Sequence, residues 1–236
     1  MNVIILAGGF GTRLKSEVDG PKVLAPVNGI PFLEYTFDYL ERFNVAKVVL
    51  SLGFLSEVII NWAKTQNRKF SIDYVIENSP LGTGGGIKLA LEKVSSDSVI
   101  VLNGDTFFNI DLNKLSSFQN NSSFEMSIAL KPLENFDRYG NVLIDDKSQI
   151  LSFEEKKYCS KGQINAGFYA ISDKNIFKNY PDVFSIEKDY LTPQAKAHKI
   201  GGVFFDEYFI DIGIPSDYQK VQNDFRTMFD KEKRTQ

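Results

Sequence analysis

The sequence of 236 residues is poor in the residue types that form disulfides, zinc sites and imidazole catalysts. It contains one cysteine, one histidine and one tryptophan. The single cysteine, Cys159, excludes an intrachain disulfide and a cysteine-rich zinc site. Without disulfides nothing points outside the cytosol, so we expect a cytoplasmic protein. The histidine, His198, lies in a predicted helix away from every motif, and we expect it at the surface rather than in catalysis.

Long apolar runs and clusters of positive charge are also missing. No segment approaches the ~20 apolar residues that a membrane helix needs, and the apolar stretch over residues 3–7 is too short for a signal peptide. Lysine and arginine are scattered and the net charge is −3, which argues against a nucleic-acid surface. We therefore expect neither a membrane nor a nucleic acid as partner. The length suits one α/β domain with a full core.

Strand-like and helix-like segments alternate through the first half of the chain. Apolar strands separated by helices predict a Rossmann-like, mostly parallel sheet with helices on both faces. Ligands of such sheets bind beyond the carboxyl ends of the strands. The predicted strands cover residues 2–7, 45–50, 72–76 and 99–102, and the predicted helices cover 31–43, 55–63 and 86–93.

The second half changes character and predicts a small antiparallel extension on the substrate side of the sheet. We expect one domain over residues 1–230, in which 1–120 mainly bind a nucleotide and 121–230 mainly bind the second substrate. The charged tail, 231–236, is expected to fray. The antiparallel strands are predicted over residues 126–130, 141–144, 150–153 and 164–171, and the helices over 187–198 and 215–229.

The first predicted strand ends in the glycine-rich loop Gly8-Gly9-Phe10-Gly11. Bare glycine amides can approach a phosphate closely, and Arg13 and Lys22 add positive charge beside the loop. The spacing matches neither the Walker A motif nor Gly-x-Gly-x-x-Gly, which weakens the case for a hydride-transferring oxidoreductase. A turn that only joins strand to helix is the alternative interpretation. The two cations favour a cradle for a nucleoside triphosphate.

Two aspartates, Asp105 and Asp211, each follow an apolar strand and precede a turn or a glycine. A lone aspartate in such a place usually caps a turn or a helix. Mg²⁺, however, favours one or two carboxylates together with phosphate oxygens and water. The pair therefore predicts a magnesium site beside the nucleotide.

The segment Leu6–Leu14, together with Pro21-Lys22, resembles the sugar-1-phosphate nucleotidylyltransferases, and similar motifs continue to Tyr218. The resemblance implies transfer of a nucleotidyl group from a nucleoside triphosphate to a sugar 1-phosphate, with release of pyrophosphate. It implies four catalytic residues: Arg13 at the pyrophosphate, Lys22 at the α-phosphate, and Asp105 and Asp211 holding Mg²⁺. The predicted nucleotide contacts are Leu6, Ala7, Gly8, Gly9, Gly11, Thr12, Arg13, Lys22, Glu77, Pro80, Gly82, Thr83, Asn103 and Gly104.

The second half supplies the predicted sugar-phosphate contacts. The resemblance implies that Glu155 accepts hydrogen bonds from sugar hydroxyls and that Lys156 holds the sugar phosphate. A solvated charged run is the alternative for both. Asn165 can donate and accept at once, which suits a sugar hydroxyl, whereas Glu187 could equally begin a helix. The full predicted set is Tyr139, Gly140, Glu155, Lys156, Asn165, Gly167 and Glu187.

The loop that begins at Glu77 is the predicted reader of the base. A carboxylate can accept both edge N–H groups of guanine as a bidentate pair, so Glu77 favours GTP, although some uridylyltransferases resemble this pattern. Within the family, the chain is most similar to bacterial D-glycero-α-D-manno-heptose 1-phosphate guanylyltransferases. That similarity implies GTP and heptose 1-phosphate as substrates and GDP-heptose for capsule or lipopolysaccharide as product.

Several alternatives to this interpretation stay open. They are guanylyl transfer to mannose 1-phosphate, uridylyl transfer to an amino sugar 1-phosphate, and a nucleotide-sugar sensor without activity. A pure sensor would need neither the paired aspartates nor a cation at the leaving group. The sequence also leaves a homodimer open.

Overall fold

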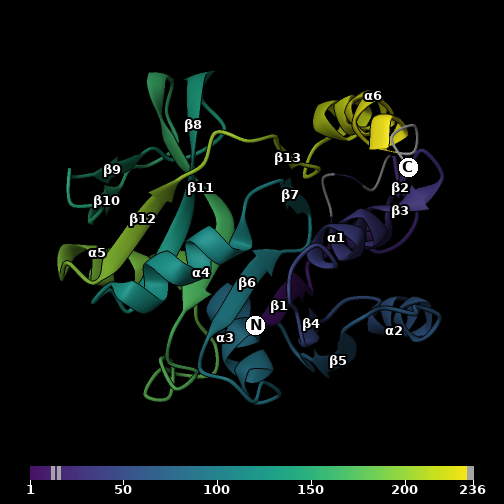
Figure 1. Ribbon diagram of the computed structural model, residues 1–236, viewed down its shortest axis with the longest axis horizontal. Coiled ribbons are helices and arrows are strands. Elements are labelled where there is room, and N and C mark those ends of the chain that lie inside the picture. The colour runs from purple at the N-terminus through teal and green to yellow at the C-terminus, as the bar shows by residue number, and fades with distance from the viewer. Residues whose placement is uncertain (12–13, 15–16, 233–236) are drawn as a thin grey trace.

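A computed structural model describes residues 1–11, 14 and 17–232 of the chain (Figure 1). Its centre is a seven-stranded sheet with the strand order β12-β8-β11-β6-β1-β4-β5. Among these strands β11 alone runs antiparallel to its neighbours, so the predicted mostly parallel sheet is confirmed. The strands are β1 (Asn2–Ala7), β4 (Lys47–Leu52), β5 (Ser71–Ile76), β6 (Val99–Asn103), β8 (Met126–Phe136), β11 (Cys159–Ile171) and β12 (Ile200–Phe204).

Helices cover both faces of the sheet, as predicted. Successive residues of a strand point to opposite faces, and in β1 the side chains of Val3 and Ile5 enter one core cluster while Ile4 enters the other. The first cluster receives α1 (Phe32–Leu40), α2 (Ser56–Lys64), α4 (Leu112–Asn121) and α6 (Pro215–Glu232). The second receives α3 (Gly82–Leu91), the π-helical turn η3 (Ile186–Leu191) and α5 (Thr192–Lys196).

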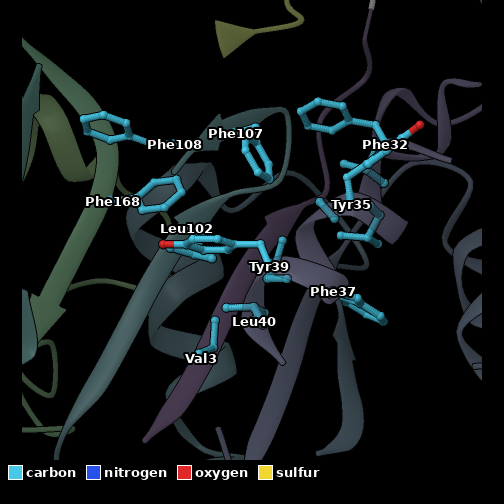
Figure 2. Packing of buried hydrophobic residues seen from close by; sticks show 14 of the residues in the cluster. Val3, Phe32, Tyr35, Phe37, Tyr39, Leu40, Leu102, Phe107, Phe108 and Phe168 are labelled. Carbon is cyan, nitrogen blue, oxygen red and sulfur yellow. The ribbon is translucent and has the colours of Figure 1, made fainter. Parts of the chain in front are cut away.

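Aromatic side chains join the C-terminal helix to the N-terminal half, and Figure 2 shows two of them, Tyr39 and Phe107. The ring centroid of Tyr39 in α1 lies 5.6 Å from that of Phe107 in β7 (Thr106–Phe108). Phe107 in turn lies 5.0 Å from Phe225 of α6, in an edge-on arrangement. Such contacts add to the stabilisation from buried area. They fix α6, and the strand that precedes it, beside the end of β6.

Several short elements complete the structure. The hairpin of β9 (Val142–Ile144) and β10 (Ile150–Phe153) is antiparallel, as predicted, and the Asp145 carboxylate accepts from the amide of Gln149 at 2.8 Å in its turn. β13 (Phe209–Asp211) pairs with β7, and β8 and β11 extend past the sheet (Figure 1). The others are the 3-10 turn η2 (Lys22–Leu24), β2 (Pro26–Val27) and β3 (Ile30–Pro31).

Some sequence-based boundaries were wrong. α3 begins at Gly82, four residues before the predicted start. Its first turn contains glycines because neighbouring groups leave no room for a side chain there. A Cβ on Gly84 would lie 2.2 Å from the ring of Phe184, and one on Gly85 would lie 2.2 Å from the carbonyl oxygen of Asp182. The predicted helix over 187–198 is a π-helical turn followed by one short α-helix. The prediction missed α4, β7 and β12.

The limits of the described part leave some expectations untested. α6 continues through Glu232, and residues 233–236 lie outside the described residues, so the fraying of the tail stays a prediction. The division into nucleotide and substrate halves also stays a prediction. Within the described ranges, none of the helices combines the length and the hydrophobicity needed to cross a membrane. His198 lies at the surface, as expected, where its Nδ1 is 2.7 Å from Nε2 of Gln149.

Candidate active site

A cleft of about 350 Å³ opens at the carboxyl edge of the parallel strands. Backbone hydrogen bonds tie together the loops that leave this edge: the amide of Gly104 donates to Leu6 at 2.9 Å, and that of Glu77 donates to Leu52 at 2.8 Å. The cleft is lined by eleven of the predicted nucleotide residues, namely Leu6, Ala7, Gly8, Gly9, Gly11, Lys22, Glu77, Pro80, Gly82, Thr83 and Asn103.

The remaining nucleotide predictions do not line this cleft. Thr12 and Arg13 lie outside the described residues. Gly104 is buried below the cleft floor, where an added Cβ would lie 2.6 Å from the carbonyl oxygen of Leu6. Gly104 therefore shapes the turn after β6 and is not exposed to the cleft.

Two lining residues were missed by the sequence analysis, Phe10 and Val23. The Phe10 side chain is 54% exposed, and its ring centroid lies 5.5 Å from that of Phe54. The sequence did offer a signal for Phe10, because this aromatic residue lies between glycines that were expected to contact the ligand. Val23 follows Lys22 in the chain and could have been included on the same reasoning.

The glycine loop packs closely against its surroundings. Gly11 has a φ of +59°, a conformation that residues with a Cβ rarely adopt. A Cβ there would also lie 3.2 Å from Cβ of Lys22. Glycine at this position thus lets the loop approach the segment that carries the cleft lysine.

The Glu77 carboxylate organises the predicted base-reading loop. Its Oε2 accepts from the amide of Leu81 at 3.0 Å, and its Oε1 accepts from the hydroxyl of Ser51 at 3.4 Å. A Cβ on Gly86 would lie 2.7 Å from Oε1, so that glycine provides space for the carboxylate. Glu77 is half-buried and lines the cleft while it holds the loop in shape.

The two predicted metal aspartates meet where β7 and β13 pair. Asp105 precedes β7, and its carbonyl accepts from the amide of Ile212 at 3.0 Å, just after Asp211 in β13. The ammonium of Lys22 forms an ion pair with the Asp105 carboxylate. Asp211 Oδ1 accepts from the amide of Gly213 at 2.7 Å. Backbone pairing therefore holds the two aspartates beside each other, and the ion pair adds the Lys22 cation at the edge of the cleft.

The electrostatics of this pair fit a divalent cation. Burial, and then the negative charge of Asp105, raise the pKa of Asp211, while Lys22 opposes the shift. Among the described residues there is no group of three or more acidic, histidine or cysteine side chains able to hold a metal. Two carboxylates leave most positions of an octahedral ion to other oxygens. That is the usual arrangement of Mg²⁺ when it is shared with a phosphate substrate.

The predicted sugar residues are more dispersed. Burial, and next the charge of Asp211, raise the pKa of Tyr139, which places this phenol near the aspartates. Gly140 packs against the backbone after β10, where a Cβ would lie 2.3 Å from the carbonyl oxygen of Glu154. Glu155 and Lys156 are exposed between β10 and β11, and they do not line the cleft.

Three further predicted sugar residues, Asn165, Gly167 and Glu187, come from β11 and η3. Asn165 Oδ1 accepts from the amide of Gly167 at 2.9 Å. Gly167 has a φ of +75°, and a Cβ there would lie 2.2 Å from the side-chain nitrogen of Asn103. Glu187 lines the cleft, and its carboxylate accepts from the hydroxyl of Thr83 at 2.8 Å. Glu187 thus reaches the cleft, whereas Gly167 packs behind the cleft residue Asn103 and Asn165 holds the turn at Gly167.

A mostly parallel sheet with a glycine-lined cleft at the carboxyl ends of its strands is typical of nucleotide-binding α/β proteins. Comparison with known families makes this more specific. The nucleotidyl transferase family matches over residues 2–227, and the chain belongs to that family. The protein is therefore a nucleotidyltransferase.

The chain is similar to two curated D-glycero-alpha-D-manno-heptose 1-phosphate guanylyltransferases. That of Aneurinibacillus thermoaerophilus is 43% identical, over 96% of this chain and 99% of the relative. That of Campylobacter jejuni is 44% identical, over 92% and 97%. Among solved structures, HddC from Yersinia pseudotuberculosis complexed with GMP-PN superposes with a TM-score of 0.85 at 39% identity, covering 95% of this chain and 99% of the other.

Proposed function

We propose that this protein transfers the guanylyl group of GTP to a sugar 1-phosphate and releases pyrophosphate. The preferred acceptor is D-glycero-α-D-manno-heptose 1-phosphate, the reaction depends on Mg²⁺, and the GDP-heptose formed supplies a surface polysaccharide. The observation that carries the proposal is the convergence of Lys22, Asp105 and Asp211 at the edge of the glycine-lined cleft. The names of the two curated relatives support the choice of GTP and heptose.

The reaction asks the protein mainly for positioning and for compensation of charge. An oxygen of the sugar phosphate attacks the α-phosphorus of GTP, and the bond from that phosphorus to the pyrophosphate breaks. The attacking oxygen is already anionic at neutral pH, so no general base is needed. Lys22 places its ammonium at the cleft for the α-phosphate. Asp105 and Asp211 would hold Mg²⁺, which when bound supplies positive charge beside the phosphates.

In this proposal the loop that follows Glu77, which the Glu77 carboxylate holds through the amide of Leu81, recognises the base. The carboxylate lines the cleft and still has lone pairs beyond those used by Leu81 and Ser51. Guanine presents two adjacent N–H donors to such a group, whereas uracil and thymine present one. GTP is therefore the nucleotide that this loop suits best.

The test is pyrophosphate release with Mg²⁺ across four nucleoside triphosphates and a panel of sugar 1-phosphates that includes the heptose. Turnover confined to GTP with heptose 1-phosphate is the expected result. Turnover with UTP, or with a hexose phosphate in preference, would replace the substrates proposed here. Nucleotide binding without any turnover would favour a sensor of nucleotide sugars.

A further inference from the structure

A cation with no role in the proposed reaction, Arg138, lies beside the aspartate pair. It belongs to the segment between β8 and β9, on the predicted sugar side. Its guanidinium forms an ion pair with Asp217 in the first turn of α6. The same guanidinium lies 5.3 Å from the ring centroid of Tyr139. Arg138 thus links the segment that leaves β8 to the start of the C-terminal helix.

Tyr139 forms a second contact between the same two parts of the molecule. Its ring centroid lies 6.1 Å from that of Phe209, in an edge-on arrangement. Phe209 begins β13, which ends at Asp211, and α6 starts a few residues later with Asp217 in its first turn. The short segment that carries Asp211 is therefore contacted on both sides of the aspartate. Tyr139 packs against Phe209 before it, and Arg138 pairs with Asp217 after it.

The other contacts of this segment come from the nucleotide side. The amide of Ile212 donates to the carbonyl of Asp105 at 3.0 Å. The hydroxyl of Tyr218, next to Asp217, donates to the carbonyl of Pro26 at 2.5 Å. The position of Asp211 is thus set by the nucleotide half through backbone pairing, and by the sugar half through Arg138 and Tyr139.

Ion pairs also connect the segments around Asp211. Lys22 pairs with Asp105, which precedes β7. Arg138 pairs with Asp217, which follows Asp211 in the chain. Each of these two cations thus pairs with a carboxylate in a segment that borders Asp211.

We propose that Arg138 is a positioning residue, which holds Asp211 in register with the Tyr139-Gly140 segment so that the two halves of the cleft meet the reacting phosphates together. The consequence for catalysis rests on the proposed function, whereas the ordering of the segment does not. Arginine suits this task because one planar guanidinium can pair with a carboxylate and lie against an aromatic ring, which a lysine ammonium does less well.

The first test compares amide hydrogen exchange in the protein without ligands. Arg138→Met is compared with Lys131→Met, which breaks a similar ion pair between Lys131, in β8 itself, and Asp206. We expect exchange over residues 209–218 to become roughly tenfold faster in the first variant, because local opening becomes easier. The control variant should match the wild type there. Unchanged exchange in Arg138→Met would overturn the proposal.

The second test separates positioning from general damage through kinetics. Displacement of a reacting group by about 1 Å can cost ~100-fold in rate, so Arg138→Met should lower kcat and raise KM for the sugar phosphate. Binding of GTP, measured by calorimetry, should stay within about twofold of the wild type, since the contacts of the nucleotide loops are untouched. Arg138→Lys should recover part of the loss, because an ammonium still pairs with Asp217.

The outcomes of the two tests can be told apart. Loss of GTP binding and of sugar-phosphate use in equal measure, or equal losses in Lys131→Met, would show a merely structural role and overturn the proposal. Faster exchange with unchanged kinetics would do the same. A wild-type protein that transfers no nucleotide would contradict the proposed function, while the exchange comparison would still decide whether Arg138 orders the segment around Asp211.

Discussion

The two halves of the cleft differ in how completely the folded chain assembles them. On the nucleotide side, eleven predicted contact residues line one cleft. Of the residues predicted to bind the sugar phosphate, Glu187 reaches that cleft, while Glu155 and Lys156 remain on an exposed loop. Residues directly after parallel strands are gathered by the sheet itself, since the carboxyl ends of these strands share one edge. Residues on a hairpin extension depend on tertiary contacts that no local pattern encodes.

The largest effect is expected from the cation of the nucleotide side. Lys22→Met should lower kcat by about 100- to 1,000-fold, because removal of one preorganised charge at a transition state typically costs that much. It also leaves Asp105 without its ion-pair partner. Steady-state pyrophosphate release measures the loss. The matched control is Lys47→Met, which breaks the Lys47–Asp73 pair between β4 and β5. Similar turnover in the two variants would remove Lys22 from the reaction.

A smaller effect, confined to one substrate, is expected on the sugar side. If Lys156 holds the sugar phosphate, Lys156→Met should raise KM for that substrate roughly tenfold and leave KM for GTP unchanged, as expected for the loss of a contact to one substrate. Initial rates with each substrate varied in turn measure this split. The neighbouring Lys157 pairs with Glu154, so Lys157→Met serves as control. Equal kinetics in the two variants would return Glu155-Lys156 to the interpretation of a solvated charged run.

These two halves also show how far sequence could lead. The sheet, its helices and the nucleotide edge follow from apolar runs, glycines and charges that lie close together in the chain. The start of α3 was misplaced because Gly84 and Gly85 are dictated by Phe184 and Asp182, about 100 residues away. Arg138 carried no signal of its own, since its partners on α6 and β13 become neighbours only in the folded chain.

Base selection gives a test that stays within the nucleotide side. Glu77→Gln replaces one acceptor oxygen by a donor, so the preference for GTP over UTP, measured as the ratio of kcat/KM values, should fall about tenfold or more. The glutamine can keep the oxygen that accepts from Leu81, which limits damage to the loop. Ser51→Ala removes only the second partner of the carboxylate and should leave the ratio nearly unchanged. An unaltered preference in Glu77→Gln would assign the reading of the base to other groups.

The smallest effect concerns stability and has the opposite sign to the effect on activity. The folded-state pKa of Asp211 is raised by burial and by Asp105, so the folded state binds this proton more tightly than the unfolded chain. Stability from this group is therefore present at low pH. It is lost as the pH rises from the ordinary aspartate pKa through the raised one. Above the raised pKa and without metal, the ionised carboxylate lowers the stability of the folded state.

Asp211→Asn removes that cost and should raise Tm by a few degrees at pH 7 in chelator, while activity is lost. The gain should shrink as the pH falls through the raised pKa of the native aspartate, because protonation then removes the same charge. Asp73→Asn is the contrasting variant, because Lys47 and the amide of Tyr74 hold the pKa of Asp73 below its ordinary value. That variant should lose stability at pH 7. A lower Tm for Asp211→Asn would mean that Asp211 stabilises the fold, rather than being retained for the reaction at the expense of stability.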